Sequence, residues 1–205
     1  MKTGFLFTFF FLGFCIISCV DDDFGEGCGD IPPHFEILGI GSSNLQFVER
    51  DINPYEILNS EDTISWDAYF TRFQFEMAFI SSNNRFGASV MALSCVPIGY
   101  KGDKIGIEVL TIKTANDYNE NYPAGSVIND IVLTNIWTYT TDDFSTFKPV
   151  SEYIDENADG VMNQTFELKL TEAPQDARSF SFDITYTLNN GEEFQHRTTP
   201  VILYE

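Results

Sequence analysis

An alternation of side-chain character at every second residue is the feature that most constrains the fold of this chain. Residues 69–79 place Tyr, Thr, Phe, Phe, Met and Phe at alternate positions, and residues 180–188 do the same with Phe, Phe, Ile, Tyr and Leu. A period of two is typical of a strand with one buried face. The second run ends at Asn189-Asn190-Gly191, which predicts a tight hairpin because these residues tolerate a positive φ.

The remaining segments are short, and turn residues separate them about every dozen positions. Pro149 to Asn157 is the one stretch that predicts a helix, because it has Pro near its start and Asn-Ala-Asp-Gly at its end. We therefore expect an all-β fold, a mainly antiparallel β-sandwich of immunoglobulin-like type with at most one short helix. Further strands are expected over residues 34–40 (continuing at 44–50 after a bulge or turn), 89–96, 105–114, 131–139, 165–170, 192–199 and 201–204.

The first eighteen residues read as a secretory signal peptide. Lys2 precedes an apolar run from Phe5 to Ile17, which is shorter than the roughly 20 residues that a membrane-spanning helix needs. The run ends in Ile16-Ile17-Ser18-Cys19, which resembles the bacterial lipobox. This resemblance implies that Cys19 becomes the first residue of the mature chain and carries lipid on its sulfur. The alternative is an ordinary signal peptide with an incidental cysteine.

The acidic cluster Asp21-Asp22-Asp23 follows Cys19 after one valine. It is similar to the surface-export signal of lipoproteins in the Bacteroidetes, and the rest of the chain is similar to uncharacterised lipoproteins of about this length from that phylum. The resemblance implies an outer-membrane location, a lipid anchor as the membrane contact, and display toward the cell exterior. The alternative is that the acids only solvate a tether. We expect a signal peptide at 1–18, an acidic Gly/Pro tether at 19–33 and a single β-sandwich domain at 34–205.

The charge of the chain limits its partners. Without residues 1–18, the chain has 187 residues and keeps 10 Lys and Arg against 31 Asp and Glu, a formal charge of −21. Binding to nucleic acid needs a basic face, so we expect no nucleic-acid partner. The same balance argues against electrostatic docking on an anionic membrane, but it is compatible with cation binding.

Two further cysteines follow Cys19 in the mature chain, Cys28 and Cys95. The cell surface permits disulfides, and a bridge between them would stabilise the fold by about 4 kcal/mol in the chain-entropy model. The alternative is two buried thiols.

The hexapeptide Asp155-Glu156-Asn157-Ala158-Asp159-Gly160 matches the opening of a calcium-binding loop. Oxygen ligands at alternate positions can wrap one Ca²⁺ ion, and Gly permits the sharp turn. Asp155, Asn157 and Asp159 are therefore the candidate ligands. The match then fails, because the twelfth position is Phe166 instead of Glu. The alternative is a solvated turn that closes the short helix.

Tyr118 and Tyr122 lie in the polar loop 115–126, beside three Asn, one Asp and one Glu between residues 116 and 121. Aromatic faces with amide and carboxylate neighbours suit a sugar ligand. The alternative is that both rings fold back on the core.

No residue pattern predicts catalysis. The two histidines, His34 and His196, are far apart in the sequence, and no Ser or Cys has the context of a known nucleophile motif. We expect a surface lipoprotein that acts as a non-catalytic binding or scaffold module for a glycan or an envelope protein. A structural component of the envelope or of a surface appendage is the alternative, and a glycan hydrolase is a lesser one.

Overall fold

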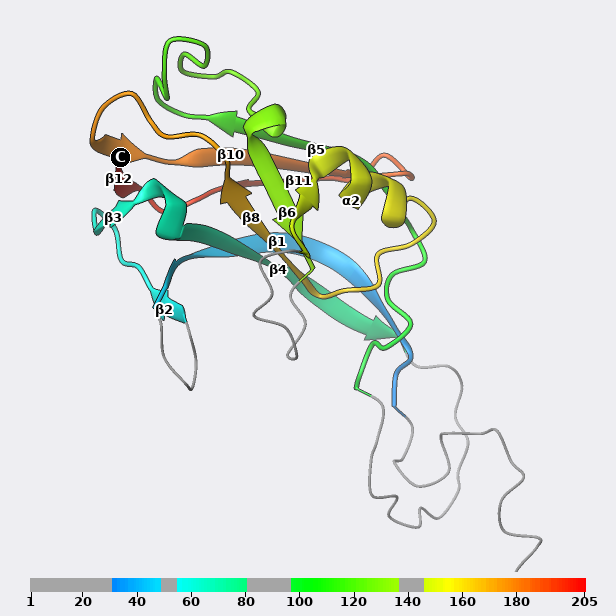
Figure 1. Ribbon diagram of the computed structural model, residues 1–205. Coiled ribbons are helices and arrows are strands. Elements are labelled where there is room, and N and C mark those ends of the chain that lie inside the picture. The colour runs from blue at the N-terminus through cyan, green and yellow to red at the C-terminus, as the bar shows by residue number, and fades with distance from the viewer. Residues whose placement is uncertain (1–30, 49–54, 81–96, 137–145) are drawn as a thin grey trace, which may run out of the picture. The chain divides into compact units, whose positions relative to one another are not determined.

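The computed structural model describes residues 31–48, 55–80, 97–136 and 146–205, and in these residues it confirms the expected all-β fold (Figure 1). The sheets are mainly antiparallel, and the described part contains one short α-helix. The chain divides into two compact units, and almost all described residues belong to the second, Pro32–Ile80 with Ile98–Glu205. The strand expected over residues 89–96 lies outside the described residues.

The largest sheet has six strands in the order β2-β1-β4-β8-β6-β7, and every neighbouring pair in it is antiparallel. Its strands are β1 (His34–Phe47), β2 (Tyr55–Ile57), β4 (Tyr69–Ile80), β6 (Val132–Asn135), β7 (Lys148–Pro149) and β8 (Thr165–Leu170). β8 and the middle of β4 follow the alternation that predicted them, with Phe73, Phe75, Phe166 and Leu168 buried on one face, whereas Phe70 is buried on the other face and Phe79 is exposed.

β1 runs through the expected break and is one strand of 14 residues. The ladder with β4 shifts by one residue between Ile37 and Gly39, inside the first expected segment, and it continues without a shift through residues 40–44, where the sequence predicted a bulge or turn. The Asp103 carboxylate supports this irregularity from outside the ladder. Its Oδ2 accepts the Ile37 N–H at 2.9 Å, and its Oδ1 accepts the Ile105 N–H at 2.9 Å.

Two smaller sheets complete the described fold. One has the order β11-β10-β5, with β5 (Ile107–Thr114), β10 (Phe182–Leu188) and β11 (Glu193–Arg197). The other has the order β3-β12-β9, with β3 (Thr63–Ser65), β9 (Arg178–Phe180) and β12 (Val201–Tyr204), and β3 runs parallel to β12. Two 3₁₀ turns, η1 (Trp66–Ala68) and η2 (Asn129–Ile131), precede β4 and β6.

The C-terminal hairpin is bent, so that its two halves belong to different sheets. The sequence predicts one strand over residues 180–188, but the strand breaks at Ser181 into β9 and β10. At the corner, Thr198 donates its N–H to the Phe182 carbonyl at 3.0 Å, and the Phe182 N–H donates to Thr198 Oγ1 at 2.9 Å. Beyond the corner, Phe180 pairs with Val201. Pro200 therefore lies between β11 and β12, at the change of sheet.

Aromatic rings fill the space between the six-stranded sheet and the β11-β10-β5 sheet. The ring of Phe73 stacks on that of Phe166 with centroids 5.0 Å apart, and Phe75 meets Tyr186 edge-on at 5.1 Å. The predicted helix is present as α2 (Val150–Glu156), and its Tyr153 ring lies 5.2 Å from Phe166. The helix therefore closes one margin of this core.

Candidate functional site

The loop 115–126 holds the two tyrosines for which the sequence predicts a ligand contact, and the structure separates their roles. Tyr118 is only 1% exposed, and its ring packs edge-on against Phe180 at 5.2 Å. Its hydroxyl donates to the Glu172 carbonyl at 2.6 Å, and burial raises its pKa. The expectation that Tyr118 stacks on a ligand is therefore corrected: burying the ring gains apolar contact, and the carbonyl satisfies the hydroxyl.

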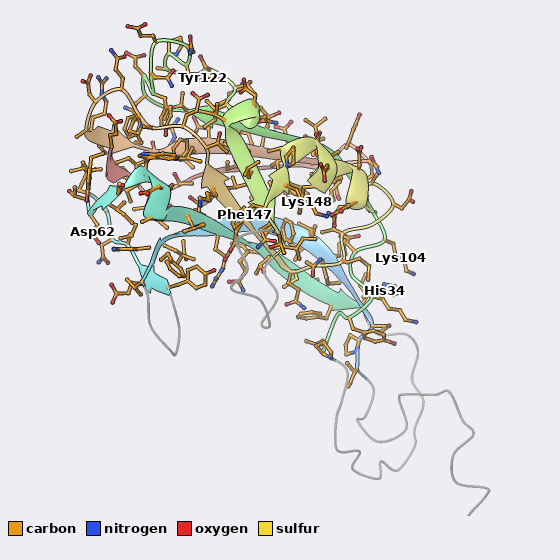
Figure 2. The ribbon with its side chains drawn as sticks, in the orientation of Figure 1. His34, Asp62, Lys104, Tyr122, Phe147 and Lys148 are labelled. Atoms are coloured by element: carbon orange, nitrogen blue, oxygen red, sulfur yellow. The ribbon has the colours of Figure 1, made fainter. Side chains whose placement is uncertain are left out.

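Tyr122 is half-buried and lies at the surface of the same loop (Figure 2). Its hydroxyl donates to Asp130 Oδ2 at 2.6 Å, and this hydrogen bond is the main reason that the pKa of Tyr122 rises to about 12. A phenol with this pKa stays neutral at physiological pH. The Tyr122 ring packs partly against the hydrophobic core, and its solvent-facing part is the aromatic surface that this loop can still offer to a ligand.

Two polar side chains of the loop, Asp117 and Asn119, close it on itself. Asn119 Oδ1 accepts the N–H groups of Asn121 (2.9 Å) and Tyr122 (3.2 Å), and Asp117 Oδ1 accepts that of Ala124 (2.8 Å). The Tyr118 N–H donates to the Tyr122 carbonyl at 2.8 Å. The loop is thus shaped by its own hydrogen bonds, and it leaves exposed the side chains of Asn116, Glu120 and Asn121.

The calcium motif begins in the last two residues of α2 and continues beyond the helix, and its three candidate ligands lie in different environments. Asp155 and Asp159 are exposed, whereas Asn157 is only 3% exposed and its Nδ2 donates to the Tyr153 carbonyl at 2.8 Å. Asn157 therefore caps the end of the helix. Across the described ranges, no three His, Cys, Asp or Glu side chains are grouped in a way that could hold a metal ion. Calcium binding by Asp155, Asn157 and Asp159 stays a prediction.

The carbonyl groups of the same segment join it to neighbouring elements. The Asn157 carbonyl accepts the Ile107 N–H at 3.0 Å, and the Ala158 carbonyl accepts Asn189 Nδ2 at 2.6 Å. The Val161 carbonyl accepts the Asp103 N–H at 2.8 Å. In a calcium loop of this type, the seventh residue, here Val161, would supply its carbonyl to the ion. These contacts give the segment a framework role that the motif did not indicate.

The two histidines lie at different places along β1: His34 is its first residue, and His196 contacts it from β11. His34 has Nδ1 at 3.2 Å from the Gly102 carbonyl. His196 Nε2 lies 2.8 Å from the Ser42 hydroxyl, and burial lowers the pKa of His196. His34 and Ser42 are eight residues apart on one strand, about 26 Å at the usual rise. The histidines do not converge on one site.

A buried polar cluster, which we call the corner network, is the main arrangement that the sequence did not predict. It comprises Asn44, Tyr69, Thr71 and the Thr199 carbonyl, and its three side chains are at most 3% exposed. Tyr69 donates to Asn44 Oδ1 at 2.8 Å, Thr71 donates to Tyr69 Oη at 2.7 Å, and Asn44 Nδ2 donates to the Thr199 carbonyl at 2.6 Å. The network fixes the bent hairpin to β1 and β4.

A second unpredicted feature is an ion pair on the other face of the six-stranded sheet. Glu167, only 1% exposed, accepts Arg72 Nε at 2.9 Å and Nη2 at 2.7 Å through its Oε1. The Arg72 guanidinium also lies 5.0 Å from the centroid of the Tyr55 ring. The sequence held a signal for this ion pair, because Arg72 and Glu167 have opposite charges and each lies within a strand of alternating side chains.

The predicted lipidation site Cys19 and the predicted disulfide partners Cys28 and Cys95 lie outside the described residues. Among the described residues, no helix is both long and apolar enough to cross a membrane. A scan against protein-family models, a search of curated proteins and a search of solved structures each found no match for this chain.

Proposed function

We propose that this chain is an outer-membrane lipoprotein whose β-sandwich is a non-catalytic binding or scaffold module displayed toward the exterior. The observation that carries the proposal is the order of segments at its start: an apolar leader, Ile16-Ile17-Ser18-Cys19, and then Asp21-Asp22-Asp23. Lipid on Cys19 anchors the domain, since each buried CH₂ group contributes about 0.8 kcal/mol and more than one chain binds stably.

The way in which the described polar side chains are used supports binding over catalysis. Asp103, Asn157 and Glu167 are buried and satisfy backbone or guanidinium groups of the fold itself. His196 is held against a serine hydroxyl. The loop 115–126 is a surface element held by its own hydrogen bonds, with Tyr122 and exposed amide and carboxylate groups, a combination that suits a sugar.

The anchor is tested by labelling cells with an alkyne fatty acid and following the protein through membrane fractionation. The wild type should carry the label and partition with the outer membrane, whereas Cys19→Ser should carry none. Equal labelling and fractionation of the two would refute the lipoprotein proposal. Replacing Asp21, Asp22 and Asp23 with Asn tests display: protease added to intact cells should then cleave less of the protein.

Ligand binding is tested on a glycan array with the purified mature chain, with and without calcium. Tyr122→Ala should lose binding, and Tyr204→Ala is the matched control because Tyr204 is an exposed tyrosine of β12. A calcium requirement that Asp159→Asn removes would support the metal prediction. No glycan binding, together with co-purification of defined envelope proteins, would favour the alternative of an assembly component.

A further inference from the structure

Five exposed apolar side chains gather where the chain enters the sandwich, and we call them the tether-end patch. Ile98 (43% exposed) and Tyr100 (40%) belong to the loop 97–104, Phe79 (39%) and Met162 (54%) lie beside its glycines, and Ile80 (49%) is the last residue of β4. Large exposed apolar patches on a soluble domain mark interaction surfaces. Within the described residues this patch is also the place where the incoming chain joins the domain.

Backbone hydrogen bonds fix the entry of the chain to this loop. Gly99 donates its N–H to the Pro32 carbonyl at 2.8 Å, and Lys101 donates to the Pro33 carbonyl at 2.7 Å. Gly99 has φ of +73°, and a Cβ there would lie 3.0 Å from the Phe79 ring, so Phe79 packs directly on the loop. The orientation of the patch relative to residue 32 is therefore set by the fold.

Positive charge accompanies the apolar groups at this end. Lys101 Nζ lies 5.6 Å from the centroid of the Tyr100 ring, and Lys104 lies at the same end of the molecule (Figure 2). The acid within the loop, Asp103, is 5% exposed and accepts backbone N–H groups with both oxygens. This end thus combines exposed apolar groups with the exposed cations Lys101 and Lys104, and the exposed acids Glu36 and Asp159 lie on the adjoining segments, in a chain whose formal charge is −20.

We infer that the tether-end patch rests on the headgroup region of the membrane in which the chain is anchored. Aromatic rings and Lys side chains are the groups that settle at a lipid–water interface. Repulsion between the acidic body and anionic headgroups would turn this end, which has exposed cations, toward the surface. The net charge argues against docking driven by charge alone, and the inference therefore rests on the apolar groups and their position.

The length of the tether makes such a contact accessible. Ile31 lies twelve positions after Cys19, which allows about 40 Å when extended and about 20 Å as a flexible coil. At this range the effective concentration of the surface is in the millimolar range, so even a weak contact is occupied. This step rests on the proposed lipid anchor, and the experiment below separates the two.

Lipidated wild type, Tyr100→Trp and Tyr204→Trp are reconstituted into vesicles of phosphatidylethanolamine and phosphatidylglycerol, with and without brominated acyl chains. Tyr204 is 42% exposed and lies at the C-terminal end of β12, so it is the matched control. Trp66 and Trp137 are common to all three proteins and are subtracted with the wild type. We expect brominated lipid to quench the indole introduced at position 100 and to shift its emission to the blue, with no change at position 204.

Flotation of the wild type with the vesicles reports the anchor separately. A protein that fails to float refutes the anchor, whereas a protein that floats without selective quenching at position 100 refutes the inference. If the unlipidated Cys19→Ser form of the Tyr100→Trp variant, in buffer without detergent, already has a blue-shifted emission that is shielded from acrylamide, another part of the chain covers the patch. That result would also overturn the inference.

Discussion

Replacing Tyr69 with Phe removes one oxygen atom from the core and breaks two hydrogen bonds of the corner network. Burial raises the pKa of Tyr69, so the phenol stays protonated and its O–H donates to Asn44 at any physiological pH. In the variant, Asn44 Oδ1 keeps only the Thr71 hydroxyl, whose Oγ1 is 3.4 Å away. The hydrogen bond from Tyr69 to Asn44 is thus lost, and the longer contact from Thr71 to Asn44 replaces it only in part.

A buried polar group that loses its partner costs about 1–3 kcal/mol. Because the Thr71 contact remains, we expect Tyr69→Phe to lower the free energy of unfolding by about 2 kcal/mol. Thr71→Val should cost about 1 kcal/mol, because the bond from Tyr69 to Asn44 survives it. For a domain of this size, the first value corresponds to a fall of about 4–8 °C in Tm. Tyr69→Phe should be the more destabilising variant, because Tyr69 both donates to Asn44 and accepts from Thr71.

Urea unfolding followed by tryptophan fluorescence measures these differences, with Tyr204→Phe as the control for loss of an exposed hydroxyl. The two core variants should shift the midpoint without changing the slope, since neither alters the surface exposed on unfolding. If Tyr69→Phe matches Tyr204→Phe in stability, the network does not hold the corner. If Thr71→Val costs more than Tyr69→Phe, the assigned donor directions are wrong.

Two other perturbations test the fold at separate points. Gly106→Ala should lower the free energy of unfolding by about 3 kcal/mol or more, because a Cβ would overlap the backbone carbonyl of Ala158. A Cβ at Gly41 meets no atom within 4 Å, so Gly41→Ala should change the free energy of unfolding by less than about 1 kcal/mol. Thermal unfolding of both variants measures the difference. His196 has a pKa lowered by burial, so the folded state takes up its proton less readily than the unfolded chain, and stability present above pH 6.5 is lost as the pH falls below it. Between pH 7.5 and 5.5, His196→Gln should therefore lose less stability than the wild type, and parallel curves for the two would contradict this.

The strands with strong alternation were predictable because one physical rule decides them. Residues 69–79 and 165–170 form β4 and β8, since a sheet with one packed face requires apolar side chains at every second position. The short helix was also predictable, because Pro149 and the Asn-Ala-Asp-Gly turn mark its ends locally.

The break at Ser181 was not predictable, since the alternation continues through it without interruption. The corner depends on Thr198, which is seventeen residues later and supplies both a hydroxyl and an N–H to Phe182. A side chain that replaces a ladder bond across such a separation has no local signature. The parallel pairing of β3 with β12 is non-local for the same reason, because it joins Ile64 to Leu203.

Local sequence also failed to predict which tyrosines of the candidate sites are exposed. Tyr118 and Tyr100 have comparable sequence surroundings, each flanked by polar or glycine residues, yet the first is buried and the second is 40% exposed. The difference is the partner that the fold supplies: Tyr118 meets the Phe180 ring and a backbone carbonyl, while Tyr100 projects from a loop whose own backbone is held by the incoming chain. Side-chain type states what a residue can bind, but the availability of an internal partner decides whether it faces a ligand. This is why Tyr118 packs in the core while Tyr122 stays a predicted ligand contact, and why the tether-end patch became visible only once the entry of the chain was placed.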